Sequence, residues 1–146
     1  MKKYRRFCRK HRNHPLDITV HHRKPKSLGG GDDKRNISHV YRYLQEAWHL
    51  LFDDHSAPQI VEEFQMFDDA FSRGKPVMLK FEKMSRQKLG RKILWWTKRQ
   101  RAWEVLFGDL STLEQKVERA NNTYLDPDYR IIVGTVRIKK VFLMKV

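Results

Sequence analysis

The residues best suited to chemistry lie in one stretch of the first half of the chain. A histidine pair, His21-His22, follows a β-branched run, and a glycine-rich loop leads from it to Asn36. An apolar segment then carries Gln45 and His49. Imidazole rings bind divalent metals and accept protons near neutral pH. The stretch therefore predicts metal-assisted acid–base chemistry.

Phosphodiester hydrolysis needs a base that activates water, a cation on the phosphate and leaving oxygen, and a rigid frame for both. Two adjacent histidines on a strand point to opposite faces, so one ring can face a metal and the other the attacking water. A neighbouring helix offers ligands four residues apart, as Gln45 and His49 are. Asn36 can fix the loop or orient the base, because its amide both donates and accepts.

The local sequence predicts the elements that position these residues. A β-branched run over residues 18–20 predicts a short strand that carries the histidine pair. Proline and glycines over residues 25–33 predict a loop, and residues 36–40 a returning strand. Apolar residues at helical spacing then predict an amphipathic helix over residues 42–53.

The segments HHRKPKSLGGGDDKRN, residues 21–36, and EAWHLLF, residues 46–52, resemble the HNH endonucleases, which are ββα-metal nucleases. The paired histidines, the proline, the Gly-Gly loop and the asparagine are similar to the family in order and spacing. The second segment is similar to the AWHxLF helix of a subgroup that lacks zinc-binding cysteine pairs. The resemblance covers roughly residues 17–66. It implies an α+β fold with a ββα-metal module and metal-dependent hydrolysis of phosphodiester bonds in DNA.

The resemblance also implies a role for each site residue. His21 and His49 would be metal ligands, His22 the general base, and Asn36 the residue that orients the loop and base. Gln45 would be a further ligand, but it stands where similar members carry a histidine. An amide oxygen suits a hard cation better than zinc. We therefore expect one divalent ion, Mg²⁺ or Mn²⁺ in preference to Zn²⁺.

The chain is strongly basic, with a formal net charge of +14 and a pI of about 10.1. This charge predicts a polyanionic partner, most simply nucleic acid, with DNA favoured by the resemblance and RNA left open. Basic residues gather in the first twelve positions and again over residues 73–103. The residues expected to contact nucleic acid are Arg5, Arg6, Arg9, Arg23, Lys24, Lys26, Arg91, Lys92, Lys98 and Arg99.

Trp95 and Trp96 lie among the lysine and arginine residues of the second basic stretch. Such interleaving is typical of proteins that stack nucleobases on aromatic rings. The alternative is that both indoles belong to the core of the predicted helix, which starts near Ser85 and is weakened at Gly90.

A single cysteine, Cys8, excludes an internal disulfide and a four-cysteine zinc site and fits a reducing cytoplasm. No apolar run approaches the roughly 20 residues of a membrane span. We expect a cytoplasmic protein with no membrane partner. The sequence leaves the oligomeric state open.

The chain contains an internal repeat. AWHLLF from Ala47 aligns with AWEVLF from Ala102 at an offset of 55 residues, and Glu104 replaces the histidine in the second copy. Ser56 with Gln59 predicts a capping box that opens a helix to about residue 71. Its counterpart is predicted to be Ser111 with Glu114.

Two β segments complete the prediction. A short strand is expected over residues 77–81, and a strand or hairpin around Gly134 over residues 130–146. The residues expected on its apolar side are Ile132, Val136, Ile138, Val141, Phe142 and Leu143.

Three parts are expected along the chain: a basic arm over residues 1–16, an HNH-like module with an added helix over residues 17–72, and a basic helical region with the second copy and C-terminal β segment over residues 73–146. An alternative function is a catalytically weakened HNH-like protein that binds nucleic acid, including one associated with ribosomes or RNA. Gln45 and the histidine-free second copy favour this alternative. His39 is an alternative metal ligand.

Overall fold

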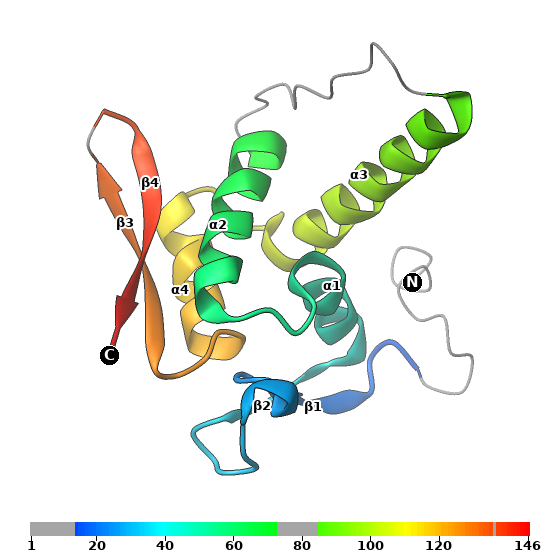
Figure 1. The fold of residues 1–146 in the computed structure, drawn as a ribbon. Helices are drawn as coiled ribbons and strands as arrows, with labels where there is room; N and C mark the ends of the chain where they lie inside the picture. The colour runs from blue at the N-terminus through cyan, green and yellow to red at the C-terminus, as the bar shows by residue number, and fades with distance from the viewer. Residues whose placement is uncertain (1–13, 73–84, 136) are drawn as a thin grey trace.

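The structure is a computed structural model that describes residues 14–72, 85–135 and 137–146. Over these residues the fold is mixed α and β, with four α-helices and two antiparallel two-stranded sheets (Figure 1). None of the described helices is long and apolar enough to cross a membrane. The elements in order are β1 (Ile18–His22), the 3₁₀ turn η1 (Lys26–Leu28), β2 (Ile37–Tyr41), α1 (Arg42–Phe52), α2 (Ala57–Phe67), the π-helical turn η2 (Asp68–Ser72), α3 (Arg86–Phe107), α4 (Leu113–Thr123), β3 (Tyr129–Thr135) and β4 (Lys139–Lys145).

The β1–β2 hairpin runs directly into α1, which is the predicted order of strand, loop, strand and helix. His21 pairs with Ser38 and His22 with Ile37 in the antiparallel register. Strand alternation buries His21, which is 2 % exposed, and leaves His22 partly exposed on the other face. The hairpin thus gives two adjacent imidazoles different surroundings.

The loop between the strands depends on two glycines. Gly29 has φ +86°, a conformation that favours glycine. Gly30 passes so close to Lys24 that an added Cβ would lie 1.8 Å from the Lys24 carbonyl oxygen. These glycines let the loop fold back onto the hairpin.

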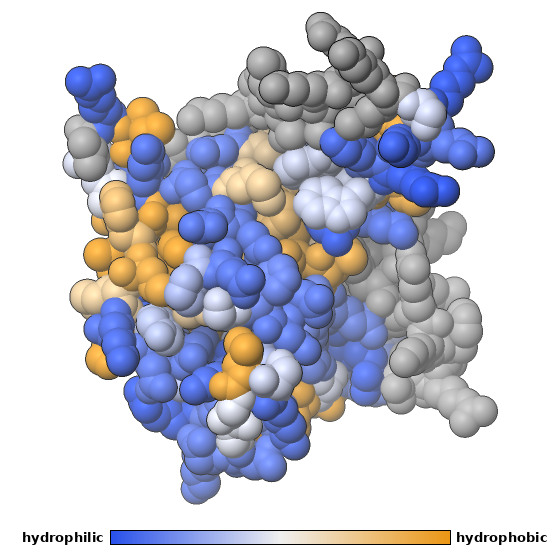
Figure 2. Space-filling model, viewed as in Figure 1, coloured by the Kyte–Doolittle hydropathy of each residue, from blue (hydrophilic) through white to orange (hydrophobic). Residues whose placement is uncertain are grey.

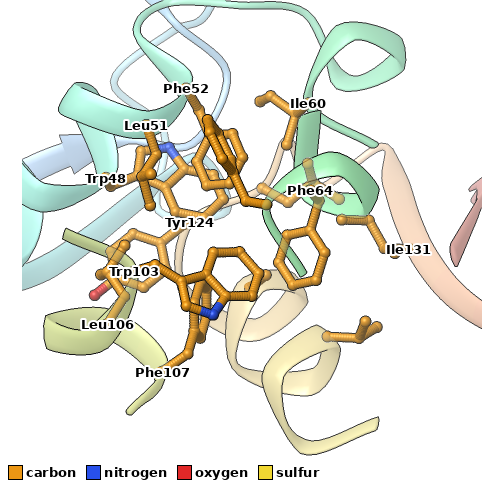
Figure 3. Close-up of a cluster of buried hydrophobic side chains, with 14 of the residues drawn as sticks. Trp48, Leu51, Phe52, Ile60, Phe64, Trp103, Leu106, Phe107, Tyr124 and Ile131 are labelled. Atoms are coloured by element: carbon orange, nitrogen blue, oxygen red, sulfur yellow. The ribbon is translucent and has the colours of Figure 1, made fainter. Parts of the chain in front are cut away.

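The core lies where the helices meet, and aromatic rings dominate it (Figure 3). Trp48 of α1 stacks on Tyr124, with ring centroids 4.7 Å apart. Phe64 of α2 meets Trp103 of α3 edge-on at 5.0 Å. A single cluster of buried residues reaches from Val40 in the first hairpin to Ile131 and Val141 in the second.

The internal repeat is reproduced in the burial of its side chains. The alanine, tryptophan, fifth-position leucine and phenylalanine are buried in both copies, and they are Ala47, Trp48, Leu51 and Phe52 in α1 and Ala102, Trp103, Leu106 and Phe107 in α3. The repeated pattern therefore encodes core-facing surfaces on two helices that pack against each other.

The first capping box forms as predicted, with Ser56 and Gln59 at the start of α2. The prediction for the second copy is wrong by one residue. Thr112 is the N-cap of α4 and Gln115 its box partner, in place of Ser111 and Glu114. The connection before α4 is one residue longer than the connection before α2, so the repeat offset rises from 55 to 56.

The predicted helix from Ser85 is confirmed. The Ser85 hydroxyl oxygen accepts a hydrogen bond from the Lys88 amide at 3.3 Å, and α3 continues unbroken through Gly90. The N-terminal half of α3 extends away from the other elements (Figure 1).

The second hairpin corrects the expected turn. Gly134 lies inside β3, opposite Lys140, and is not part of the turn between the strands. The Phe142 ring covers Gly134, where an added Cβ would lie 2.7 Å from it. Glycine is therefore needed at this position because the Phe142 ring packs on it, and not because the chain turns there.

The expected apolar side of this hairpin is also wrong for three residues. Ile131 and Val141 face the core, whereas Ile132, Ile138 and Phe142 are more than 40 % exposed. Because side chains alternate along a strand, a one-residue error in register exchanges the two faces. Val136 and the strand expected over residues 77–81 lie outside the described residues.

Candidate active site

His21 lies on the inward face of β1 in a single tautomer. Its Nε2 is 2.9 Å from the carbonyl oxygen of Tyr124, and a carbonyl only accepts, so Nε2 carries the proton. The lone pair is therefore on Nδ1, which is buried and has no hydrogen-bond partner among the described residues. A histidine that donates one ring N–H to a carbonyl and offers the other nitrogen is the usual arrangement of a metal ligand.

Burial is the largest influence on this imidazole. It lowers the pKa of His21 to about 4, against a smaller raising effect of the hydrogen bond to Tyr124. The ring is consequently neutral at physiological pH, and a metal can bind it without displacing a proton.

His49 of α1 is the nearest second imidazole. Its ring centroid is 5.8 Å from that of His21. Asp54 Oδ1 lies 3.7 Å from His49 Nδ1, which is too long for a hydrogen bond. A strand and a helix thus bring together two imidazoles that could each provide a nitrogen ligand to a metal. The described residues contain no group of three or more His, Cys, Asp or Glu side chains that could hold a metal.

Gln45 faces β1 from the adjacent turn of α1. Its Nε2 donates to the Val20 carbonyl oxygen at 3.0 Å, and its Oε1 accepts from the Thr19 hydroxyl. These bonds fasten α1 to β1. A carbonyl oxygen has two lone pairs, so Gln45 Oε1 can accept the hydrogen bond from Thr19 and still have one lone pair for a metal. The role of Gln45 as a ligand therefore stays a prediction.

His22 projects from the opposite face of β1 towards the glycine-rich loop. Its Nε2 lies 2.7 Å from Asp32 Oδ1, and Lys26 Nζ lies 3.4 Å from the same oxygen. The hydrogen bond to His22 first, and then the charge of Lys26, lowers the pKa of Asp32. The carboxylate is therefore ionised and can hold the ring in one orientation.

Asp32 is the site residue that sequence reasoning missed. The available signal was the Asp-Asp pair that follows the glycines. The two acids have different tasks, because Asp33 accepts hydrogen bonds from the amides of Arg35 and Asn36, both at 3.1 Å, while Asp32 reaches His22.

Asn36 closes the loop that carries Asp32. It is 4 % exposed, and its Oδ1 accepts from the Lys24 amide at 2.7 Å. Its Nδ2 donates to the carbonyl oxygens of Lys24 at 3.1 Å and Gly31 at 2.8 Å. Gly31 directly precedes Asp32, so the asparagine positions the carboxylate that contacts His22.

His39 and His55 lie apart from this arrangement. His39 is exposed and sits opposite Val20 on the outer face of the hairpin, the face away from His21. His55 follows α1, and its Nδ1 lies 2.7 Å from Glu63 Oε1.

The predicted nucleic-acid contacts have mixed surroundings. Arg91 and Lys92 are exposed on α3, whereas Lys98 and Arg99 are partly buried. Arg23, which directly follows β1, donates to the carbonyl oxygens of Leu125, at 2.8 Å, and of Asn121. These two bonds join the end of β1 to the C-terminal end of α4. Lys24 and Lys26 belong to the loop beside His22. Outside the described residues lie Arg5, Arg6 and Arg9.

Comparisons with protein-family models, curated proteins and solved structures give no match to this chain. The candidate site is therefore judged on its own geometry. That geometry comprises two imidazoles whose ring centroids are 5.8 Å apart, one with a buried lone pair, and a third imidazole held by a carboxylate.

Proposed function

We propose that this chain is a metal-dependent endonuclease of the HNH type that hydrolyses phosphodiester bonds in DNA. The observation that carries the proposal is the unpartnered, buried Nδ1 of a His21 ring whose centroid is 5.8 Å from that of His49, with His22 held separately by Asp32. The formal charge of +14 supports a polyanionic substrate.

Each residue has a distinct task in this proposal. His21 and His49 would hold one divalent ion, Mg²⁺ or Mn²⁺, with Gln45 as a candidate third ligand. A bound ion of this kind polarises the phosphate and stabilises the leaving oxygen. His22 takes the proton from the attacking water, and Asp32 stabilises the imidazolium that forms.

Nicking of supercoiled plasmid in Mg²⁺, Mn²⁺ or Zn²⁺ tests the proposal. His22→Ala is expected to lower the rate by about 10²-fold or more, because it removes the general base. His39→Ala is the matched control, since it removes an imidazole from the outer face of the same hairpin. Equal nicking by wild type and His22→Ala, or no nicking with any of these metals, would refute the enzymatic role.

The second candidate is a nucleic-acid-binding module without catalysis. The hydrogen bonds of Gln45 to β1 favour it, as does the lack of a three-residue ligand group within the described ranges. It predicts salt-sensitive binding to structured RNA with no divalent requirement. Elemental analysis separates the two candidates: the endonuclease binds about one divalent ion per chain and loses it in His21→Ala, whereas the module binds none.

A further inference from the structure

A cavity of about 480 Å³ opens where the C-terminal end of α1 meets α2 and α3. Its size falls within the range of about 300–1,000 Å³ that is typical of small-molecule sites. The lining residues that bear on its chemistry are His49, His55, Glu63, Trp95 and Arg99. Because His49 belongs to both the cavity and the candidate metal centre, a group bound in one lies beside the other.

One wall of the cavity carries a flat cationic surface, the Arg99–Trp95 platform. The guanidinium carbon of Arg99 lies 3.7 Å from the centroid of the Trp95 ring. Trp96, at 5.0 Å, and Phe67, at 6.4 Å, support the same ring. Nucleobases stack on aromatic rings and on arginine planes. This wall is therefore suited to a planar, uncharged ring.

The wall contributed by α2 carries a hydrogen-bond acceptor that lacks a donor. Glu63 Oε1 is 2.7 Å from His55 Nδ1, but Glu63 Oε2 is buried with no hydrogen-bond partner in the described part of the chain. A buried carboxylate oxygen without a donor is destabilising. Glu63 lines the cavity, so a rotation of its side chain would turn this oxygen towards a donor bound there. The amino groups of cytosine and adenine are such donors, whereas thymine presents a carbonyl oxygen at the corresponding position.

The internal repeat provides a natural comparison. A second cavity, of about 810 Å³, is lined by Tyr43, Glu104, Asp109 and Arg119. Glu104 corresponds to His49 at the offset of 55, and Arg119 to Glu63 at the offset of 56. Arg119 binds Asp109 through two hydrogen bonds of 2.7 and 2.9 Å. Arg119 and Asp109 of the second cavity thus satisfy each other, unlike Glu63 Oε2 beside His49.

We infer that the cavity beside His49 binds one unpaired nucleobase that bears an amino group. Its ring would stack on the Arg99–Trp95 platform, and its amino group would donate a hydrogen bond to the Glu63 carboxylate. The inference deepens the proposed function, on which it rests for the choice of nucleic acid as ligand. A base held there is outside a base pair. The preferred substrate is therefore single-stranded, or opened, next to the phosphate at the metal centre.

Binding of fluorescent oligonucleotides of about 12 nucleotides, a length that spans a typical single-strand site, tests the inference. The full chain is titrated in EDTA, so that binding is measured without cleavage. Wild type is expected to bind oligodeoxycytidine about tenfold tighter than oligothymidine, as for one hydrogen bond to a charged group. Glu63→Gln is expected to reduce this ratio to about one, because it removes the charged acceptor. Glu62→Gln, the exposed neighbour on α2, should keep the wild-type ratio.

A second variant tests the platform and does not depend on Glu63. Arg99→Met is expected to weaken binding of both oligonucleotides about tenfold, within the range found for loss of one stacking contact. Arg101→Met removes the same charge from an exposed position of α3 and should have a smaller effect. Thermal unfolding of each variant verifies that it folds.

Equal affinity of wild type for the two oligonucleotides, or a preference that survives Glu63→Gln, would overturn the inference. The same pair made as RNA, cytidine against uridine, identifies which polymer shows the preference, and a preference in either supports the cavity. Plasmid nicking without any base preference would remove the cavity and leave the endonuclease in place. A preference lost in Glu63→Gln, but without nicking, would keep the cavity and reject the endonuclease.

Discussion

His21 and His22 are adjacent in the sequence and have opposite surroundings. One ring is 2 % exposed and bonded to a main-chain carbonyl, and the other faces a solvent-exposed carboxylate. Alternation along β1 produces this difference, because successive side chains leave a strand on opposite faces. The same dipeptide can therefore supply a neutral ligand and a separately held base.

The buried His21 predicts an acid-sensitive stability in metal-free protein. Its pKa is about 4 in the folded chain and about 6.5 when the chain is unfolded, so between these values the unfolded state binds more protons. Stability is then fully present above pH 6.5 and falls as the pH is lowered towards 4, by about 3 kcal/mol in all.

Urea unfolding in EDTA at several pH values between 7 and 4 measures this loss. His21→Asn lacks the titrating group and should lose less stability over that range, whereas His39→Asn should behave as wild type. An identical pH dependence in wild type and His21→Asn would disprove the assignment.

Asp32 is predicted to position the His22 ring. Asp32→Asn should lower kcat about tenfold, less than the 10²–10⁴-fold effect of a general base itself. KM should stay unchanged, since the proposed role of Asp32 is exerted through the His22 ring. Steady-state kinetics on an oligonucleotide substrate measures both constants, with Glu118→Gln as a control for loss of one exposed negative charge. A change confined to KM would instead place Asp32 in substrate binding.

At the scale of elements, side chains join the first hairpin, the helices and the second hairpin. Arg23 ties β1 to the end of α4, and Gln45 ties α1 to β1. Asn121 of α4 holds β3, because its side chain accepts from the Ile131 amide at 2.7 Å and donates to the Ile131 carbonyl oxygen at 2.8 Å. Each hairpin has only two strands, and such a hairpin has little stability alone.

Asn121→Ala is expected to lower the free energy of unfolding by about 2–4 kcal/mol, because both main-chain groups of Ile131 lose a buried partner. Asn122→Ala is the matched control on the exposed face of α4 and should change stability by less than about 0.5 kcal/mol. Chemical denaturation of the two variants decides the matter. Equal stabilities would mean that the second hairpin is held by its apolar contacts alone.

At the scale of the whole molecule, the core and the charge are arranged separately. One aromatic cluster joins both copies of the repeat and both hairpins. Polar residues cover most of the face shown in Figure 2, with a hydrophobic area over the β3–β4 hairpin. Ile132 and Phe142, which pair across that hairpin, are exposed. The basic residues of α3 lie on a helix that reaches outward from this core (Figure 1).

This arrangement predicts a salt-dependent DNA affinity in which α3 matters most. Replacing Arg91, Lys92 and Lys98 together by glutamine should reduce the slope of log K against log salt by about 2–3, if each side chain contacts one phosphate.

The control is a variant in which three basic residues of the second hairpin, Arg130, Lys140 and Lys145, are replaced by glutamine. It removes the same charge and should leave the slope near its wild-type value. An equal reduction of the slope in both triple variants would show that DNA affinity depends on the total charge of the protein and not on the position of the charges on α3.

The first hairpin, α1 and the repeated core surface could be predicted because their signals are local. Two-residue alternation around His21 and helical spacing around Trp48 depend on neighbours in the sequence. The N-cap at Thr112 and the core-facing side of β3 were mispredicted for a different reason. A loop of one extra residue and a one-residue change of register leave almost no trace in composition, yet they exchange which side chains are buried.

The sequence by itself determined which residues could do chemistry here and which local element carries each of them. Tertiary structure decided what those residues contact: the Tyr124 carbonyl, 103 positions from His21, selects its tautomer, and the packing of α2 against α3 places Glu63 and Arg99 around one cavity. Periodicity is short-range, whereas such contacts depend on how distant segments pack, and only the folded core specifies that.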